Sequence, residues 1–262
     1  MNAITASSWP YPRWIAHRGA GKLAPENTLA AFRLGAQHGY RMFECDAKLS
    51  ADGVPFLLHD ATLERTTNGR GTGGDLPLGA LAQLDAGSWH SRAYAGEAVP
   101  TLEALARFCI ANGYFLNIEI KPTPGQEETT GRVVGETAAR LWQGQAVPPL
   151  FSSFKPDALA GAQATAAHIP RALLLDTLWD GCLDTARRLG CVAIVCNHAL
   201  WDAALVAQVK DMGMRTLSYT INDDWAAQRL IALGTDGIIT DRVDLFRPPR
   251  RKAHLPTDPA LS

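Results

Sequence analysis

The chain has 262 residues, of which 47% are hydrophobic and 19% are charged, and its formal net charge is −1. Such a nearly neutral chain lacks the overall charge that attracts proteins to nucleic acid or to anionic membranes. It has no run of about 18 apolar residues, and residues 1–13 lack the features of a secretory signal. We therefore expect a globular protein with no nucleic-acid partner and no stable membrane insertion, in which any affinity for anions comes from a local site.

The cysteines indicate a reducing compartment. They are Cys45, Cys109, Cys182, Cys191 and Cys196. Their number is odd, and most of them lie inside apolar runs, which predicts free, buried thiols in a cytoplasmic protein. Cys191 and Cys196 lack the second pair that a cysteine metal site would need.

The start of the chain predicts one strand and one helix. The short apolar run Trp14–Ala16 predicts the strand, and the run Leu29–Leu34 predicts the helix. Asn27 or Thr28 can cap the beginning of this helix, and Gly39 can end it.

A hairpin and a long insertion follow. The second strand is expected at about Met42–Lys48, and a turn at residues 52–53 leads into the hairpin arm Val54–Leu58. Residues 60–100 are rich in Gly and Thr and only weakly periodic. This segment is longer than an ordinary connection, so it predicts an insertion with a structure or function of its own.

From residue 101 onwards, helices and strands alternate regularly. The expected strands are 114–120, 150–153, 171–175, 192–196, 215–220 and 237–240. The expected helices are 101–109, 129–142, 156–167, 182–189, 201–212 and 224–233. From Leu150 the strands recur roughly every 22 residues, which is the length of one βα unit.

With the first two strands included, the pattern gives eight βα units in about 250 residues. It predicts an α/β fold, a (β/α)8 TIM barrel with a small insertion between strand 2 and strand 3. A doubly wound open sheet is the alternative, but no Gly-rich phosphate loop follows the first strand. We expect a single catalytic barrel over residues 1–247, with the insertion at about 60–100, and a C-terminal tail over residues 248–262.

Polar side chains gather where the early strands end. They are His17, Arg18, Glu44, Asp46, His59, Glu119 and Lys121. Active sites of (β/α)8 barrels lie at the C-terminal ends of the strands, so these residues are expected to share one site. Side chains two residues apart on a strand point the same way, so Glu44 lies with Asp46 and Glu119 with Lys121.

Three of these residues are carboxylates that can hold a metal. Glu44, Asp46 and Glu119 offer only oxygen ligands. Such a set suits a hard divalent cation, Mg²⁺ or Ca²⁺, better than zinc, which normally takes histidine or thiolate.

The remaining four residues suit acid-base chemistry on an anion. An imidazole side chain ordinarily titrates near neutral pH, so of the pair His17 and His59 one can take a proton while the other gives one. Arg18 and Lys121 can hold an anionic group. With the carboxylates, this constellation predicts metal-assisted chemistry on a phosphate ester.

A set of short motifs is spread over the chain. In order they are Ile15-Ala16-His17-Arg18-Gly19, Ala24-Pro25-Glu26-Asn27-Thr28, Glu44-Cys45-Asp46, His59-Asp60 with Leu63-Glu64-Arg65-Thr66-Thr67-Asn68-Gly69, Asn117-Ile118-Glu119-Ile120-Lys121-Pro122, Tyr219-Thr220-Ile221-Asn222 and Thr235-Asp236-Gly237-Ile238-Ile239-Thr240-Asp241. Each motif is short, but the set is specific. Over about residues 14–245, and in the same order, it resembles the glycerophosphodiester phosphodiesterase family.

The resemblance implies a TIM barrel that hydrolyses a small-molecule glycerophosphodiester to glycerol 3-phosphate and an alcohol, using a divalent cation. It implies that His17 and His59 are the acid/base pair. The implied metal ligands are Glu44, Asp46 and Glu119, and the implied phosphate contacts are Arg18 and Lys121. Many members have Trp where this chain has Tyr219, which keeps an aromatic wall but leaves substrate preference open.

Two other classes of function are alternatives for such a barrel. A lysophospholipase D, or another lipid-directed phosphodiesterase on the same barrel, would need an apolar mouth or a membrane-facing helix, for which the insertion offers Trp89 and Tyr94. A non-catalytic barrel that only binds phosphodiesters would tolerate loss of a histidine or carboxylate, and all are present here.

The sequence does not choose between the two histidines as base, between water and the glycerol 2-hydroxyl as nucleophile, or between head groups and oligomeric states. We expect several head groups to be accepted, because a polar pocket would hold mainly the glycerophosphate half.

Overall fold

A barrel of parallel strands forms the centre of the molecule. The computed structural model describes residues 9–246 and 248, so the expected tail at 248–262 lies, apart from Pro248, outside the described residues. The barrel strands are β1 (Trp14–Ala16), β2 (Met42–Leu49), β4 (Phe115–Ile120), β5 (Leu150–Ser153), β6 (Arg171–Leu175), β7 (Ala193–Asn197), β8 (Arg215–Tyr219) and β9 (Gly237–Thr240). They pair in the order β1-β9-β8-β7-β6-β5-β4-β2, and a β1–β2 pairing closes the ring. The predicted (β/α)8 barrel is confirmed.

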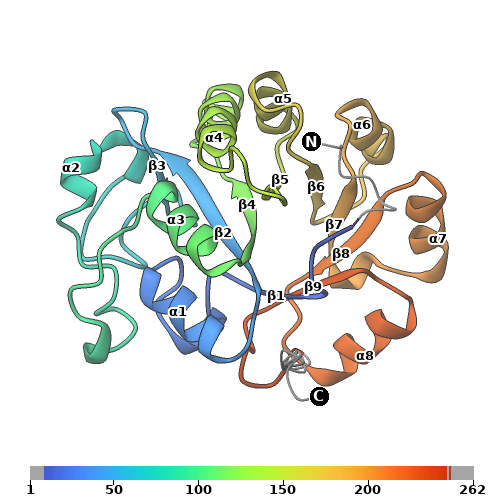
Figure 1. Cartoon of the computed structure of the whole chain (residues 1–262), viewed down its shortest axis with the longest axis horizontal. Coiled ribbons are helices and arrows are strands. Elements are labelled where there is room, and N and C mark those ends of the chain that lie inside the picture. The colour runs from blue at the N-terminus through green and yellow to red at the C-terminus, as the bar shows by residue number, and fades with distance from the viewer. Residues whose placement is uncertain (1–8, 247, 249–262) are drawn as a thin grey trace, which may run out of the picture.

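Helices connect the strands and surround the barrel (Figure 1). They are α1 (Leu29–Gln37), α3 (Leu102–Asn112), α4 (Glu127–Leu141), α5 (Pro156–Thr165), α6 (Cys182–Arg188), α7 (Ala203–Asp211) and α8 (Asp224–Ala232). Their bounds lie close to those predicted, and side-chain caps set the starts of α1, α3, α7 and α8. The Thr101 side chain accepts a hydrogen bond from the Ala104 amide at the start of α3, and Gly113 ends that helix with φ 63°.

The long segment between the second and third barrel strands has a core of its own. β3 (Pro55–Leu57) pairs antiparallel with β2, with Leu57 opposite Ala47, as the predicted hairpin requires. Beyond β3, the short helix α2 (Leu78–Leu81) and its neighbouring loops lie beside α1 and α3 (Figure 1). The small apolar cluster buried in this part of the chain consists of Phe56, Leu58, Leu63, Leu81, Ala86 and Val99.

The interior of the barrel changes from apolar to polar along its axis. An apolar layer inside it includes Ile15, Met42 and Leu150. Glu44 and Asp46 follow Met42 on β2 at intervals of two residues, so they point to the same side, nearer the C-terminal end of the strand. The alternation along one strand therefore places carboxylates directly above the apolar layer.

All five cysteines are free and buried, as predicted. Among the helices that the structure describes, none combines the length and hydrophobicity that a membrane crossing requires.

Glycines allow α4 and α5 to approach each other closely. A Cβ atom on Gly161 of α5 would lie 2.2 Å from the carbonyl oxygen of Glu128 on α4. A Cβ atom on Gly131 of α4 would lie 1.9 Å from the carbonyl oxygen of Ala158 on α5. Both separations are far inside van der Waals contact, so a larger residue at either position would force the helices apart.

We expect Gly161→Ala to lower the free energy of unfolding by about 1–3 kcal/mol, the usual cost of overpacking a closely packed contact. Urea denaturation followed by circular dichroism measures this change. Gly79→Ala is the matched control, because Gly79 is exposed on α2 and a Cβ there would meet nothing within 4 Å. Equal stability of the two variants would contradict the close approach of α4 and α5.

Candidate active site

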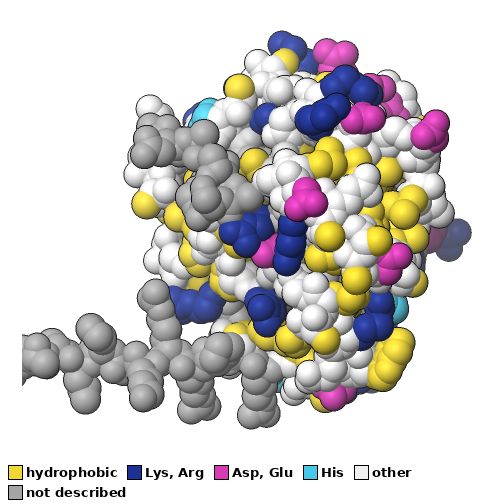
Figure 2. Space-filling view, turned by 90° about the vertical axis from the view of Figure 1, so that its right-hand side faces the viewer, with side chains coloured by type: hydrophobic (Ala, Val, Ile, Leu, Met, Phe, Trp, Pro, Cys, Tyr) yellow, Lys and Arg dark blue, Asp and Glu magenta, His cyan; other side chains and the backbone are white. Residues whose placement is uncertain are grey.

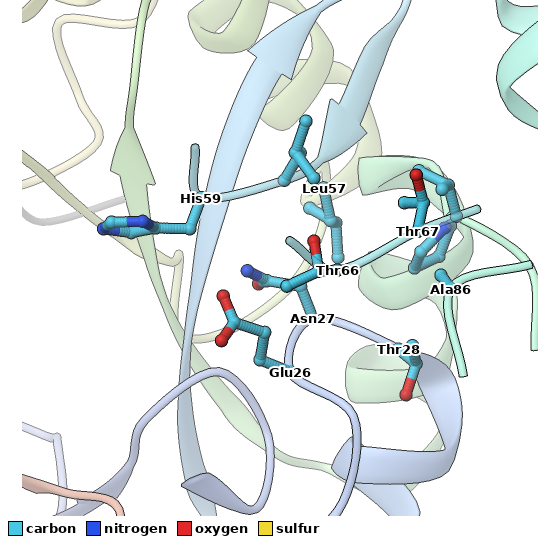
Figure 3. A pocket seen from close by; sticks show the side chains of 11 residues that line it. Glu26, Asn27, Thr28, Leu57, His59, Thr66, Thr67 and Ala86 are labelled. Atoms are coloured by element: carbon cyan, nitrogen blue, oxygen red, sulfur yellow. The ribbon is translucent and has the colours of Figure 1, made fainter. Parts of the chain in front are cut away.

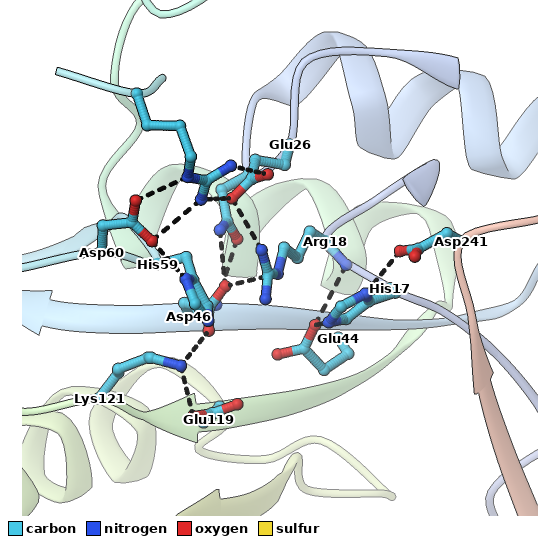
Figure 4. Close-up of polar contacts among 12 residues, drawn as sticks. His17, Arg18, Glu26, Glu44, Asp46, His59, Asp60, Glu119, Lys121 and Asp241 are labelled. Atoms are coloured by element: carbon cyan, nitrogen blue, oxygen red, sulfur yellow. Dashed lines mark hydrogen bonds and ion pairs between the residues drawn. The ribbon is translucent and has the colours of Figure 1, made fainter. Parts of the chain in front are cut away.

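Three carboxylates meet at the C-terminal ends of β2 and β4. Glu44 and Asp46 come from β2 and Glu119 comes from β4, and the parallel register sets Asp46 opposite Glu119. One oxygen of each carboxylate lies within 4.8 Å of the others, and all three residues are buried. The predicted metal ligands are therefore brought together, with both histidines close by (Figure 4).

Placing three like charges in a buried site shifts the pKa values of the carboxyl groups. Burial, together with the charge of Asp46, raises the pKa of Glu119 to about 7. Burial and the two neighbouring carboxylates raise the pKa of Glu44 well above its ordinary range. Burial acts in the same direction on Asp46, but Arg18 and Lys121 outweigh it and hold the pKa of Asp46 below its ordinary value. The nearby cations thus neutralise only part of the cluster.

Both predicted phosphate contacts flank these carboxylates. Arg18 Nε lies 3.2 Å from Asp46 Oδ2, and Arg18 Nη1 donates a hydrogen bond of 2.9 Å to Glu26 Oε1. Lys121 Nζ lies 3.2 Å from Glu119 Oε1 and 3.7 Å from Asp46 Oδ1. Two cationic side chains therefore lie on opposite sides of Asp46, one from the loop after β1 and one from the end of β4.

The backbone of the loop after β1 is held closely against its neighbours. The Arg18 amide donates a hydrogen bond of 3.1 Å to Glu44 Oε2, and Arg18 has a φ of 50°, which is uncommon for a residue with a side chain. Gly21 has a φ of 57°, and a Cβ atom there would lie 2.1 Å from Asp241 Cα. Glycine is required at that point because the loop passes directly over the end of β9.

Asn27 fixes the Asp46 carboxylate. Its Nδ2 donates a hydrogen bond of 2.8 Å to Asp46 Oδ2, and its Oδ1 accepts one of 3.1 Å from the Asp46 amide. Asn27 has a φ of 60°, in the left-handed region that asparagine tolerates better than most residues. Of the two residues predicted as candidate caps of α1, the capping residue is Thr28, whose hydroxyl accepts a hydrogen bond from the Ala31 amide.

Several buried polar atoms of the site find no hydrogen-bond partner among the described residues. They include Glu44 Oε1, Asp46 Oδ1, both side-chain polar atoms of Asn117, and Ser152 Oγ. Buried acceptors without a partner are costly, so carboxylate oxygens left in this state are well suited to a cation.

His17 is held by a carboxylate from the opposite end of the sequence. Its Nδ1 lies 2.6 Å from Asp241 Oδ1, and Asn222 donates a hydrogen bond of 3.0 Å to the other oxygen. Burial raises the pKa of Asp241, but the hydrogen bond from His17 prevails and the pKa is about 2. The ionised carboxylate can only accept, so Nδ1 carries the proton. Nε2 is left facing the cluster, 3.7 Å from Glu44 Oε2.

His59 is held in the same way by its neighbour in sequence. His59 Nδ1 lies 2.6 Å from Asp60 Oδ1. Arg65, from the insertion, donates hydrogen bonds of 2.6 Å to Asp60 and 2.8 Å to Glu26. Hydrogen bonds from Arg65 and His59 hold the pKa of Asp60 below its ordinary value, so Nδ1 is the donor here too. Burial lowers the pKa of His59, which favours a neutral ring.

The cluster opens into a cavity of about 160 Å³ that both histidines line. Phe154 and Tyr219 form an aromatic wall, with ring centroids 5.7 Å apart and planes nearly perpendicular. The Tyr219 hydroxyl donates a hydrogen bond of 3.1 Å to the carbonyl oxygen of Leu175, which fixes the ring. All of the predicted site residues thus lie in or beside one cavity.

A second, much smaller cavity of about 10 Å³ lies where the insertion meets the barrel (Figure 3). Its lining includes Glu26, Thr66 and Thr67, and Figure 3 shows the His59 ring directed away from the two threonines. This space holds about one water molecule. It is therefore a gap in the packing between the insertion and the barrel, too small for an organic ligand.

Sequence reasoning assigned no role to several residues of this site. Asn117 could have been found, because it shares its strand face with Glu119 and Lys121 at intervals of two residues. The pairing of His17 with Asp241 spans 224 positions in the sequence, and no local pattern indicates it. The other residues of this kind are Glu26, Asp60, Arg65, Ser152 and Asn222, while Asn27 is predicted only as a candidate cap of α1.

A carboxylate cluster, two carboxylate-held histidines and two cationic groups at the C-terminal end of a (β/α)8 barrel define an enzyme active site. Residues 17–245 match the model of the glycerophosphoryl diester phosphodiesterase family. YhdW of Bacillus subtilis strain 168 is 34% identical over 240 residues, which cover 88% of this chain and 95% of that protein. The glycerophosphodiester phosphodiesterase of Caldanaerobacter subterraneus is 32% identical over 233 residues, covering 87% of this chain and 93% of the relative.

A solved structure agrees with these sequence matches. A phosphodiesterase of Oleispira antarctica, in complex with the product sn-glycerol-3-phosphate, superposes with a TM-score of 0.83 and 36% identity, covering 90% of this chain and 95% of that one. The chain belongs to the glycerophosphoryl diester phosphodiesterase family and is a phosphoric diester hydrolase by membership.

We expect Asn27→Ala to lower the free energy of unfolding by about 1.5–3 kcal/mol, because it removes a buried hydrogen bond to a charged group. Thermal denaturation measures the change. Asn27→Gly is the control: it loses the same hydrogen bonds but adopts the positive φ freely, so it should be more stable than Asn27→Ala by about 1 kcal/mol. Wild-type stability of both variants would show that the contact with Asp46 contributes nothing.

Proposed function

We propose that this chain hydrolyses glycerophosphodiesters to sn-glycerol 3-phosphate and an alcohol, in a single catalytic barrel and with the help of a divalent cation. The observation that carries the proposal is the placement of two carboxylate-held histidines beside a buried carboxylate cluster that has Arg18 and Lys121 on its flanks. The product complex of the Oleispira antarctica phosphodiesterase supports the substrate class.

Glu44, Asp46 and Glu119 would hold the cation. The unpartnered oxygens of Glu44 and Asp46, and the raised pKa values of Glu44 and Glu119, fit a site that a further positive charge completes. The all-oxygen donor set suits Mg²⁺ or Ca²⁺. When bound, such a cation polarises a phosphoryl oxygen and stabilises the charge that develops there.

The two histidines would divide the proton transfers. One ring, neutral at the start, accepts a proton at Nε2 from the attacking hydroxyl, whose oxygen bonds to phosphorus. The other ring, starting as the imidazolium, donates its Nε2 proton to the departing alkoxide as the old P–O bond breaks. The attacking group is either water or the glycerol 2-hydroxyl, which would first give a cyclic phosphate. Asp241 and Asp60 keep the Nδ1 protons in place, so each ring presents Nε2 to the reaction.

Arg18 and Lys121 would bind the phosphate. Both lie beside Asp46, where their charge can be shared between the carboxylate cluster and an incoming anion. Charge-assisted hydrogen bonds from such groups stabilise the additional negative charge of a phosphoryl transition state. Tyr219 would supply an aromatic wall against the carbon skeleton of the substrate.

A lipid-directed activity is the second candidate function. Leu178 and Trp179, on the loop after β6, and Trp225, at the start of α8, are exposed by 49%, 41% and 72%. These positions follow β6 and β8, so they lie toward the catalytic end of the barrel. Figure 2 views the side of α6, α7 and α8, where hydrophobic side chains gather between charged ones. Such a surface would suit an amphiphilic substrate such as a lysophospholipid.

We expect glycerol 3-phosphate to be released from glycerophosphocholine, the release to stop with EDTA, and added Mg²⁺ or Ca²⁺ to restore it. An enzyme-coupled assay for glycerol 3-phosphate measures this, with choline release from lysophosphatidylcholine followed in parallel. Full activity after removal of metal would contradict the role of the carboxylates. Activity confined to the lysolipid would favour the second candidate.

His17→Ala and His59→Ala should each lower turnover by roughly 10²–10⁴-fold, the usual contribution of a general acid or base. Steady-state kinetics on the folded variants measures the loss. The exposed His168 is the control, and His168→Ala should leave turnover unchanged. Near-normal turnover of either active-site variant would remove that histidine from the mechanism.

A further inference from the structure

The active site opens into two spaces that share one wall. The inner space is the 160 Å³ cavity inside the barrel mouth, and the outer space, of about 420 Å³, lies between the loops that follow β3, β4 and β5. The residues that line both are His59, Glu119, Lys121 and Phe154. Three of these belong to the machinery proposed for the phosphate, so the scissile phosphate is expected at the shared wall.

A phosphodiester held at this wall has two arms, and each space can receive one. The inner space is the smaller one, and barrel side chains such as Asn117, Ser152 and Leu174 line it. Every substrate of the proposed reaction has the same glycerophosphate half, which suits this confined space. The departing alcohol differs between substrates, which suits the larger and more open space between the loops.

The outer space carries more positive charge than its carboxylates can balance. Lys48 is 2% exposed and lines this space, with its Nζ donating a hydrogen bond of 3.0 Å to the carbonyl oxygen of Lys121. Lys155 lines it from the loop after β5 and is exposed. Across residues 9–246, neither lysine forms an ion pair with a carboxylate. Asp60, on the same lining, is already engaged by Arg65.

The aromatic ring in this space is poorly placed to bind a cation. Choline-type head groups are commonly recognised by the open face of an aromatic ring. Among the described residues that line the outer space, Phe154 is the one Phe, Tyr or Trp, and Lys121 Nζ lies over its ring, 5.9 Å from the centroid. A second cation on this face would meet the charge of Lys121, which lowers the affinity for quaternary or primary ammonium groups.

We propose that the outer space binds the departing alcohol and favours alcohols that carry an anionic group over those that carry only a cationic one. This rests on the proposed phosphodiesterase activity and names its preferred substrate class. Several head groups still react, because the inner space and the phosphate contacts are common to all. Lys155 is the specificity-determining residue that can be changed without disturbing the metal or the histidines, since it is exposed and touches none of them in the described hydrogen bonds and ion pairs.

The test uses two substrates that differ by one carboxylate, glycerophosphoserine and glycerophosphoethanolamine. We expect wild-type kcat/KM for glycerol 3-phosphate release to be higher for the serine diester. Lys155→Glu should lower the ratio of the two kcat/KM values by roughly threefold to tenfold, because the reversal removes an exposed charge attraction, worth up to about fivefold, and adds a repulsion of similar size. The ratio should also shrink as salt concentration rises.

Arg132→Glu is the matched control, because Arg132 is exposed on α4 and lines neither space. The ratio of the two kcat/KM values in this variant should equal that of the wild type. A wild-type ratio at or below one, or a ratio that Lys155→Glu leaves unchanged, overturns the proposal. Glycerophosphoglycerol, whose alcohol is neutral, separates this result from failure of the proposed function: hydrolysis of that diester shows that the enzyme is active whatever the ratio.

Discussion

Mutual repulsion among three buried carboxylates is the constraint on which the rest of the catalytic end depends. Glu44 and Asp46 are fixed by one strand and Glu119 by the next, and the register between these strands leaves no freedom to move the charges apart. Asp46, whose carboxylate stays ionised, is compensated by opposite charge close by and by the hydrogen bond from Asn27. The loops after β1 and β4 therefore have to deliver Arg18 and Lys121 to the same place, and they do.

Both histidines are held in the same way, although their partners come from different parts of the fold. Each has a carboxylate on Nδ1, and each carboxylate is itself held by a further donor: Asn222 for Asp241, and Arg65 for Asp60. Fixing the carboxylate fixes the tautomer and the direction of the ring. Reactive nitrogens are thus aimed from two sides of the barrel at the space above the carboxylate cluster.

The sequence predicted the barrel well because its signals are local. Hydrophobic runs, capping residues such as Thr101 and stops such as Gly113 define each element without reference to the rest of the chain. It also predicted the main site residues, because strand ends in a parallel barrel converge at one face. Partners that reach across the fold were not predictable in this way, since Asp241 meets His17 only after the ring closes. Asn27 could be read as a capping residue, and only the three-dimensional structure shows that it serves Asp46.

Arg65 connects the insertion between β3 and α3 to the active site. It is the one residue of that segment, within the described chain, that forms ion pairs with both Asp60 and Glu26, the carboxylates that hold His59 and Arg18. In the described chain, residues 66–100 form no ion pair with either carboxylate, so a change in their length would leave these contacts in place. An exchange of residues 61–100 as a block would have to supply a new arginine, or another means of orienting His59, before it could persist.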